Sequence, residues 1–191
     1  MSIRERRERE RLDRERLIVE AAREFAEAEG WDAVTTRRLA ERIEYSQPVL
    51  YSHFKGKDAI MAAVALDGFA ELAAALRAAR TGAPDAHTAL AAVAAAYAHF
   101  AEARPVLYET MFTRAVDVVF ASLETPAPLQ EGFGEVRAAV RAVVGDEEID
   151  AQTEVFWASL HGLMTLMRGG RLRREDHERR LGVLVDGFAK N

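Results

Sequence analysis

The sequence predicts an all-α protein of about nine helices, and three observations lead to this prediction. Apolar residues recur at intervals of three and four over most of the 191 residues, which is the period of an amphipathic helix. Gly and Pro number only 12 and 5, and they lie mostly between the periodic stretches. Nearly half of the residues are apolar, and Ala, which has the highest helix propensity, is very frequent among them.

The first predicted helix runs from about residue 11 to residue 29. Leu17, Ala21, Phe25 and Ala28 step along it by three and four, so we expect them to form its buried side. Gly30 ends this helix, and a residue that follows such a glycine commonly packs back on the last turn. Trp31 stands there, and we expect it to lie in the core.

Two short helices are predicted to meet at a tight turn between residues 35 and 57. The first begins at Thr35 or Thr36 and buries Leu39, Ala40 and Ile43, which are spaced as one helical face. A three-residue turn follows over residues 44–46. Two small helices joined in this way form a helix-turn-helix, which binds duplex DNA.

The second short helix is expected to start near Gln47 and to end near Phe54. Ser46 is placed to accept a hydrogen bond from a backbone N–H of the first turn, where the missing N–H of Pro48 is harmless. Leu50 and Phe54, four residues apart, form the inward pair. The side chains left outside are those of Gln47, Pro48, Val49, Tyr51 and His53.

That outward set has the chemistry of base recognition. In a helix-turn-helix the N-terminal residues of the second helix enter the major groove. A Gln there can pair with adenine, and small apolar groups meet thymine methyls. Taken singly, Tyr51 and His53 are equally compatible with an ordinary solvated surface, as are Arg37 and Arg38 on the first short helix, and it is the spacing that favours DNA binding.

The stretch Thr-Thr-Arg-Arg-Leu-Ala, followed by Gln-Pro-Val-Leu-Tyr-Ser-His, resembles the DNA-binding domain of the TetR family of bacterial transcription regulators. The resemblance implies base contacts from Arg37, Gln47, Pro48 and Val49, and phosphate contacts from Thr36, Tyr51, His53 and Lys57. Ser46, at the start of the second helix, completes the expected DNA-binding set.

One position departs from the family pattern. The turn residue that is usually Gly in the family is Glu44 in this chain. If the position requires a left-handed backbone, a residue with a side chain costs roughly 1 kcal/mol there. A carboxylate near phosphates is also mildly repulsive, so we expect an effect on affinity rather than on the mode of binding.

The remaining helices are expected to form a second domain, so that residues 1–56 are the DNA-binding domain and residues 57–191 the ligand-binding and dimerisation domain. Gly56 marks a helix start, and the helix that follows changes its apolar face near Gly68. Residues 113–128 show no clear period and are expected to form a loop with a helical start. The predicted helices of this part cover about residues 57–80, 84–103, 106–112, 129–144, 150–168 and 175–189.

Two segments of this second part, one around Tyr97 to Phe112 and one containing Trp157, His161 and Gly162, resemble the C-terminal domain of a TetR subfamily named for its Trp, His and Gly. The resemblance implies a domain that binds a ligand and dimerises. Bulky side chains from three helices are candidates to surround a small apolar or amphipathic effector: Phe100, Tyr108, Met111, Phe112, Phe156, Trp157, His161 and Met164.

Two interpretations of these side chains stay open. Taken singly, each Phe or Met is better explained as ordinary core than as a ligand contact. His161 lies four residues after Trp157, on the same helical face. It is either a hydrogen-bonded core histidine or one of the few polar groups that orient a ligand in an apolar pocket.

The last two helices each carry an apolar stripe, and terminal helices of this kind usually need a partner. We therefore expect a homodimer through them. A two-fold dimer places two recognition helices about 34 to 36 Å apart and predicts a palindromic operator, most simply one from which the effector releases a repressor.

Charge and composition bound the other function classes. The chain has no Cys, which excludes disulfides and thiol catalysis, and no cofactor, metal-binding or hydrolase motif is present, so we expect no enzyme. A helical adaptor that binds protein is the remaining alternative; it predicts no salt-dependent affinity for DNA. No signal peptide or membrane-spanning apolar run is evident, which predicts a cytoplasmic protein.

The net charge of −5 conceals an uneven distribution. Residues 1–57 hold 13 basic and 12 acidic residues, whereas the rest of the chain holds 13 and 19. Residues 1–16 alone contain seven Arg and five acidic residues. Such a run is either a salt-bridged helix extension or an arm that adds contacts to DNA.

Overall fold

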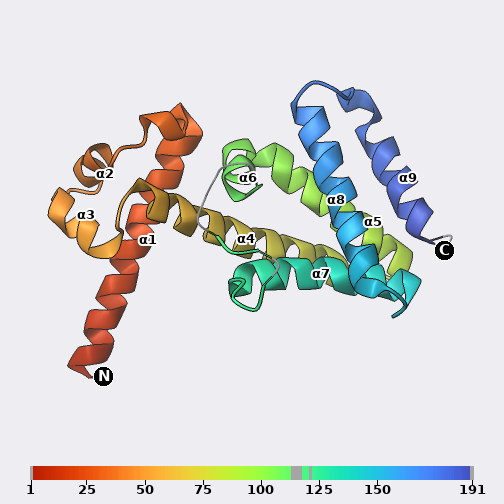
Figure 1. Ribbon diagram of the computed structural model, residues 1–191, viewed down its shortest axis with the longest axis horizontal. Coiled ribbons are helices and arrows are strands. Elements are labelled where there is room, and N and C mark those ends of the chain that lie inside the picture. Colours follow the sequence, from red (N-terminus) through yellow and green to blue (C-terminus); the bar gives the residue numbers. More distant parts are fainter. Residues whose placement is uncertain (1, 113–117, 121, 190–191) are drawn as a thin grey trace. The chain divides into compact units, whose positions relative to one another are not determined.

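The computed structural model describes residues 2–112, 118–120 and 122–189 (Figure 1). Over these residues the regular structure consists of nine α-helices and two short 3-10 helices, which confirms the all-α prediction. The helices are α1 (Ile3–Glu29), α2 (Thr36–Arg42), α3 (Gln47–His53), α4 (Lys57–Thr81), α5 (Ala86–Ala103), α6 (Pro105–Phe112), α7 (Ala127–Val144), α8 (Ile149–Arg168) and α9 (His177–Ala189), with the 3-10 helices η1 (Trp31–Ala33) and η2 (Arg174–Asp176).

The helices group into two compact units. The first unit contains residues 1–68 and 105–124, and the second contains residues 69–104 and 125–191. These units describe packing: the first unit combines α6, which contacts α1, and the first part of α4 with α1, α2 and α3. The functional division into residues 1–56 and 57–191 therefore stays a prediction.

Helix α1 is longer than the sequence suggested, and its buried side is different. It starts at Ile3 because the Ser2 hydroxyl accepts the Glu5 N–H and the Glu5 carboxylate accepts the Ser2 N–H, which is a capping box. The side chains of Leu17 and Ala28 are exposed, so the prediction that they are buried was wrong. The buried residues of α1 are Ile18, Val19, Ala21, Ala22 and Ala26, whose small Ala members let neighbouring helices approach closely.

Trp31 lies in the core of the first unit, as predicted. Its side chain is fully buried, and its indole N–H donates to the Thr110 hydroxyl of α6 at 2.6 Å. The Trp31 carbonyl accepts a hydrogen bond from the ammonium group of Lys57, the first residue of α4. One residue thus connects the end of α1 to both α4 and α6.

Gly68 shows how closely α6 approaches α4 in this unit. A methyl group added at Gly68 would lie 2.7 Å from the Met111 sulfur and 2.9 Å from a Leu107 methyl carbon. No side chain larger than a hydrogen fits there without movement of the Met111 and Leu107 side chains. Met111 and Leu107 are correspondingly buried.

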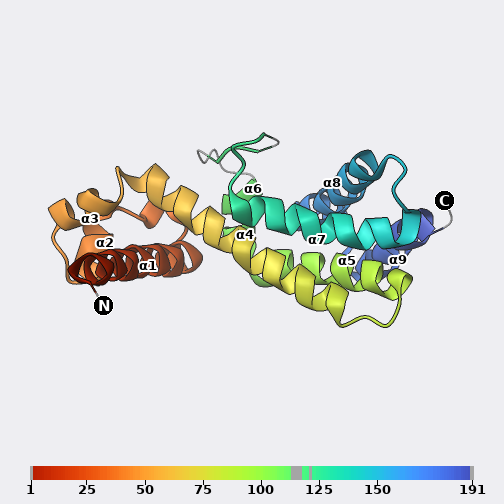
Figure 2. The same cartoon turned by 90° about the horizontal axis from the view of Figure 1, so that it is seen from below.

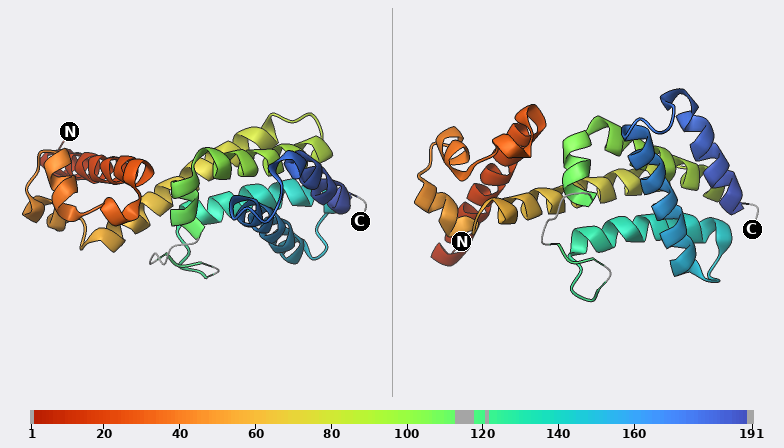
Figure 3. Two further views of the ribbon diagram at one scale, coloured as in Figure 1. Left: turned by 90° about the horizontal axis from the view of Figure 1, so that it is seen from above. Right: turned by 45° about the horizontal axis from the view of Figure 1, so that its top comes forward.

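Helix α5 is the centre of the second unit, where it contacts α7, α8 and α9 (Figures 2 and 3). It starts at Ala86, two residues later than predicted, because the Asp85 side chain accepts the Thr88 N–H and caps it. On α8, Val155 is exposed, whereas Ile149 and Thr153 take part in the core.

The segment before α7 is described at residues 118–120 and 122–126. The predicted helical start of this segment lies at residues 113–117, outside the described residues. Residues 118–120 and 122–126 are in loop or turn conformations, as expected, and α7 begins at Ala127.

Helix α4 contradicts one expectation about membrane-spanning segments. Its length and hydropathy are sufficient to cross a membrane, contrary to the expectation that no segment has this property. Half of the apolar window is nevertheless buried inside the structure, as in the core helix of a folded protein.

A buried carboxylate joins α7 to α4 within the second unit. Glu135 is 8% exposed, and its two oxygens accept hydrogen bonds from Arg77 at 2.7 Å and from Arg80 at 2.8 Å. Burial alone raises the pKa of Glu135, but the two guanidinium groups outweigh burial, so the pKa of this carboxyl lies below its ordinary value. The ionised form therefore stabilises the folded state.

Replacing Glu135 with Gln should lower the free energy of unfolding at neutral pH by about 1 to 3 kcal/mol, because two charge-assisted hydrogen bonds are weakened. Since the pKa of Glu135 is lowered on folding, this contribution is present above the unfolded value of 4.5 and is lost as the pH falls through the folded value. Urea denaturation at several pH values measures the difference.

The matched control is Glu131→Gln, which removes the same charge from an exposed partner of Arg77. This variant should lower the free energy of unfolding only slightly, because an exposed ion pair contributes little to stability. An equal loss of stability in both variants would contradict the role assigned to Glu135.

Candidate nucleic-acid interface

The first helix of the α2–α3 pair has the start and the buried residues that the sequence predicted. The Thr35 hydroxyl accepts the Arg38 N–H at 3.2 Å and caps α2. Leu39, Ala40 and Ile43 are buried, as is Leu50 on α3. The two helices thus share one small apolar contact that fixes their mutual orientation.

Glu44, in the turn, adopts a left-handed backbone with φ of 57°. This is the conformation for which the family pattern uses Gly. The left-handed backbone therefore costs conformational free energy at Glu44, because this residue has a side chain. The turn is held by the Tyr45 N–H, which donates to the Ala40 carbonyl at 2.9 Å.

Ser46 occupies the N-cap position of α3, but its hydroxyl accepts no capping hydrogen bond, so that prediction was wrong. A cap hydroxyl accepts from the second or third residue of the helix. The second residue here is Pro48, which has no N–H, and the third is Val49, whose N–H donates to the Ser46 carbonyl. The side chain of Ser46 instead lies exposed at the start of α3.

One side of α3 is open to solvent, as expected for a recognition helix. Gln47, Pro48, Val49 and Tyr51 are exposed, while Leu50 between them is fully buried. The Tyr51 hydroxyl lies 3.3 Å from the hydroxyl of Thr36, the first residue of α2. The structure therefore brings together two side chains to which the family resemblance assigned phosphate contacts.

Arg37 and Arg38 are neighbours with different surroundings. Arg37 is exposed, and the nearby Glu41 carboxylate, 2.9 Å from its Nε, raises the pKa of its guanidinium. Arg38 donates twice to Glu29 and once to the Ala33 carbonyl, and it lies over the Phe25 ring. Arg37 is thus available to DNA, whereas Arg38 attaches α2 to α1.

His53 and Lys57 lie differently from expectation. The His53 side chain is only 7% exposed, with Nδ1 3.4 Å from the Glu15 carboxylate of α1, so the prediction that it projects outward was wrong. The reason is that α3 ends against α1, a long-range contact that local spacing does not reveal. The Lys57 ammonium donates to the Trp31 carbonyl, which leaves two of its three hydrogens for another acceptor.

Lys55 is a candidate that the sequence reasoning overlooked. It is exposed in the segment between α3 and α4. A pattern in the sequence indicates it as a possible phosphate contact: basic or potentially basic side chains occupy three alternate positions, at His53, Lys55 and Lys57.

The eight candidate ligand residues are divided between the two units. Tyr108, Met111 and Phe112 belong to the first unit, where Tyr108 and Met111 are buried and the Tyr108 and Phe112 rings are 4.8 Å apart. The other five belong to the second unit: Phe100, Phe156, Trp157, His161 and Met164.

In the second unit, Phe156 and Met164 are fully buried core residues. Trp157 and His161 are half-buried, with ring centroids 6.4 Å apart. His161 lies between two hydroxyls, with Nδ1 3.5 Å from Tyr97 and Nε2 3.4 Å from Thr165. Burial lowers the pKa of His161, which favours a neutral ring with one donor and one acceptor nitrogen.

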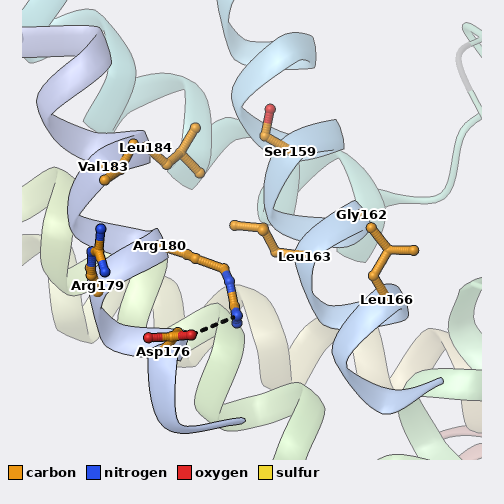
Figure 4. A pocket seen from close by; sticks show the side chains of 9 residues that line it. All are labelled: Ser159, Gly162, Leu163, Leu166, Asp176, Arg179, Arg180, Val183 and Leu184. Carbon is orange, nitrogen blue, oxygen red and sulfur yellow. Dashed lines mark hydrogen bonds and ion pairs between the residues drawn. The ribbon is translucent and has the colours of Figure 1, made fainter. Parts of the chain in front are cut away.

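A groove lies between the outer sides of α8 and α9, which run antiparallel (Figure 4). Leu166 and Val183 are 41% and 67% exposed in it. Arg180 and Asp176 form an ion pair of 3.5 Å at one end. The groove is lined by Ser159, Gly162, Leu163, Leu166, Asp176, Arg179, Arg180, Val183 and Leu184.

Two family descriptions match the sequence. Residues 18–64 match the model "Bacterial regulatory proteins, tetR family", and residues 90–188 match "Tetracyclin repressor-like, C-terminal domain". The first match contains α2 and α3, and the second contains the groove between α8 and α9.

Relatives of similar length are HTH-type transcriptional regulators. The chain is 27% identical over 169 residues to the uncharacterized regulator YobS of Bacillus subtilis, covering 85% of this chain and 83% of YobS. It is 30% identical over 173 residues to the uncharacterized regulator Rv0681 of Mycobacterium tuberculosis, covering 84% and 72%. Similarity to the class C tetracycline repressor of Escherichia coli is higher, at 46%, but covers only 55 residues, or 29% of this chain and 25% of the repressor.

Solved structures agree with the fold. A protein of unknown function from Rhodococcus sp. RHA1 superposes with a TM-score of 0.73 at 26% identity, covering 92% of this chain and 93% of that one. The TetR family transcriptional regulator PfmR from Thermus thermophilus superposes with a TM-score of 0.62 at 22% identity, covering 91% and 97%.

Replacing Glu44 with Gly should raise the free energy of unfolding by less than about 1 kcal/mol, because the left-handed backbone strain exceeds the entropy that Gly adds to the unfolded chain. It should also raise affinity for duplex DNA, since one carboxylate is removed beside the exposed side of α3. Thermal denaturation and fluorescence anisotropy measure the two effects.

Glu148 offers a matched control, since it has φ of 49° at the start of α8 in the other unit. Glu148→Gly should stabilise the protein similarly and leave DNA affinity unchanged. If Glu44→Gly lowers stability, the strain assigned to this turn is absent.

Proposed function

The chain belongs to the tetR family of bacterial regulatory proteins, and from this premise we propose that it is a homodimeric transcriptional repressor that leaves a palindromic operator when a small effector binds. DNA-binding regulation is the activity of the family, and the relatives of similar length carry it in their names. The homodimer, the repressor role and the effector response are the parts that we propose. We place the protein in the cytoplasm, where such an operator is accessible.

The observation that carries the proposal is the exposed side of α3. Gln47, Pro48 and Val49 occupy its first turn, and the rest of the helix is held by the buried Leu50. Insertion of this end into the major groove would place the Gln47 amide against an adenine edge and the apolar groups against thymine methyls. The hydroxyls of Thr36 and Tyr51 would then lie at the groove edge, in position to donate to phosphates.

Binding to a duplex from the region upstream of its own coding sequence tests the proposal. Wild-type protein should prefer this duplex to a scrambled one at moderate salt. Arg37→Ala should weaken specific binding by about 1 to 3 kcal/mol if it contacts a base edge. Tyr51→Phe should weaken binding to all sequences by losing a phosphate hydrogen bond. Anisotropy titrations measure both.

Arg141→Ala is the control for net charge, because Arg141 is exposed on α7 and pairs only locally with Asp146 among the described residues. It should leave affinity unchanged. Equal binding of wild-type protein to the operator and the scrambled duplex would end the proposal.

The groove between α8 and α9 supports the dimer. Exposed apolar side chains on adjacent antiparallel helices are the surface on which a second copy can form a four-helix contact. A two-fold axis there would make the contact self-complementary, since the same residues meet from both sides. Two recognition helices related in this way would read half-sites about 34 to 36 Å apart.

Placing a charge in the groove should separate the dimer. Leu166→Glu combined with Val183→Glu brings like charges together in an apolar contact, so the variant should sediment as a monomer and lose operator affinity. The control is Val155→Glu, because Val155 is 58% exposed on α8 but does not line the groove. Sedimentation velocity distinguishes the two, and a dimeric groove variant would contradict this interface.

The effector is proposed to be small and apolar or amphipathic. In the second unit, Tyr97, Trp157 and His161 supply polar atoms within a largely apolar core, which is the composition of sites that orient such ligands. Its binding would release DNA only if the effector has a higher affinity for a state of the dimer in which the recognition helices no longer match the operator.

A further inference from the structure

The first four turns of α1 form a charged extension that the family description does not cover. The family match begins at residue 18, whereas α1 begins at Ile3. Residues 3–14 are all exposed, and α1 continues past α2 and α3 to the N-terminus (Figure 1). This extension carries most of the seven arginines of residues 1–16.

The extension is an ordered helix rather than a flexible tail. The capping box at Ser2 and Glu5 supplies its first turn with partners. Ion pairs continue along its surface, from Arg6 to Glu10 at 3.6 Å and from Arg11 to Glu8 at 2.8 Å. Its arginines are therefore presented on a rigid support, which lowers the entropy that a bound state would lose.

Four arginines form one line along this helix, which we name the arginine stripe: Arg4, Arg7, Arg11 and Arg14. They follow one another at intervals of three, four and three, so they share one side of the helix. Arg7 lies roughly three whole turns before Ile18, so the two residues share a side of the helix. In the same way, Arg14 lies roughly two turns before Ala21, and Arg4 roughly five turns before Ala22. Because Ile18, Ala21 and Ala22 are buried, the stripe continues the buried side of α1 beyond the helices that cover it.

The covered side of α1 is the side on which the end of α3 lies. Arg11 donates to the Glu15 carboxylate at 2.8 Å, and the same carboxylate oxygen lies 3.4 Å from Nδ1 of His53, the last residue of α3. The buried side of α3 contacts α1 and α2, and its last residue lies against α1 at the base of the extension. A duplex on the exposed side of α3 would consequently pass along the side of the extension that carries the stripe.

We infer that the arginine stripe binds the phosphates of the DNA that flanks the base pairs read by α3, an inference that rests on the proposed DNA-binding function. Arg7 and Arg14 form no ion pair with any described residue, so their guanidinium groups need not leave a carboxylate to bind phosphate. Arg4 to Arg14 spans about 15 Å of helix, which matches four to five base pairs.

A second protein helix is a poorer partner for this extension. Its exposed apolar residues are Ile3 and Leu12, with Leu17 at its base. These are nine and five residues apart, so no two of them repeat at the three- or four-residue spacing that a helix–helix contact requires. The extension therefore suits a charged partner such as DNA better than the apolar face of another helix.

The experiment compares two double variants that remove the same charge. Arg7→Ala with Arg14→Ala removes two stripe arginines that form no ion pair with any described residue. Arg6→Ala with Arg9→Ala is the control. Arg6 and Arg9 lie five whole turns before Glu24 and Glu27, which are exposed, so these two arginines are on the side of α1 opposite to the stripe. Ala favours helix, and circular dichroism verifies that each variant keeps its helical content.

The probes are duplexes that wild-type protein selects from a randomised pool, each prepared with and without five base pairs of flank on both sides. Affinity is measured by anisotropy between 50 and 200 mM salt. The slope of log affinity against log salt falls by about 0.9 for each phosphate that the protein no longer neutralises. On flanked duplex, the stripe variant should therefore show a slope smaller by about 2 to 4 for the dimer, and the control variant an unchanged slope.

On duplex without flanks, the stripe variant and wild-type protein should bind alike. A third variant, Arg7→Lys with Arg14→Lys, keeps the charge and should restore most of the slope. Equal changes in the stripe and control variants would assign the effect to net charge and overturn the inference, as would a stripe variant with the wild-type slope. Failure of wild-type protein to select any sequence would instead overturn the proposed function, and the stripe with it.

Discussion

A seven-residue helix is too short to persist in water by its own hydrogen bonds, and the proposed DNA interface depends on how α3 is nevertheless held. Leu50 is its one fully buried side chain among the described residues, and it packs with the buried residues of α2. His53 closes the far end against Glu15 of α1. Packing through so few side chains is what leaves Gln47, Val49 and Tyr51 free to meet another molecule.

Trp31 provides the support behind this arrangement. Its ring fills the core of the first unit, its indole N–H is satisfied by Thr110, and its carbonyl accepts from Lys57. A buried indole without a partner for its N–H is costly, so the pairing with Thr110 fixes α6 relative to the end of α1. The contact links positions 79 residues apart in the sequence.

The second unit combines an apolar core with a few polar groups that are satisfied internally. Glu135 is stable as a buried carboxylate because two guanidinium groups serve it. His161 is placed between two hydroxyls and is kept neutral by burial. The first arrangement stabilises the fold, while the second leaves a half-buried ring beside Trp157.

The sequence by itself determined the helical class, the positions of most helices, the start of α2, the core position of Trp31 and the outward side of α3, because each follows from local periodicity and from side chains within a few residues. Tertiary structure decided the rest: that His53 turns toward Glu15, that Lys57 bonds to Trp31, that Glu135 is buried between Arg77 and Arg80, and that Leu17 and Val155 are exposed. Each of these depends on which distant helix arrives at a given face. A single sequence records its own spacing along one helix, but not the partner that covers it.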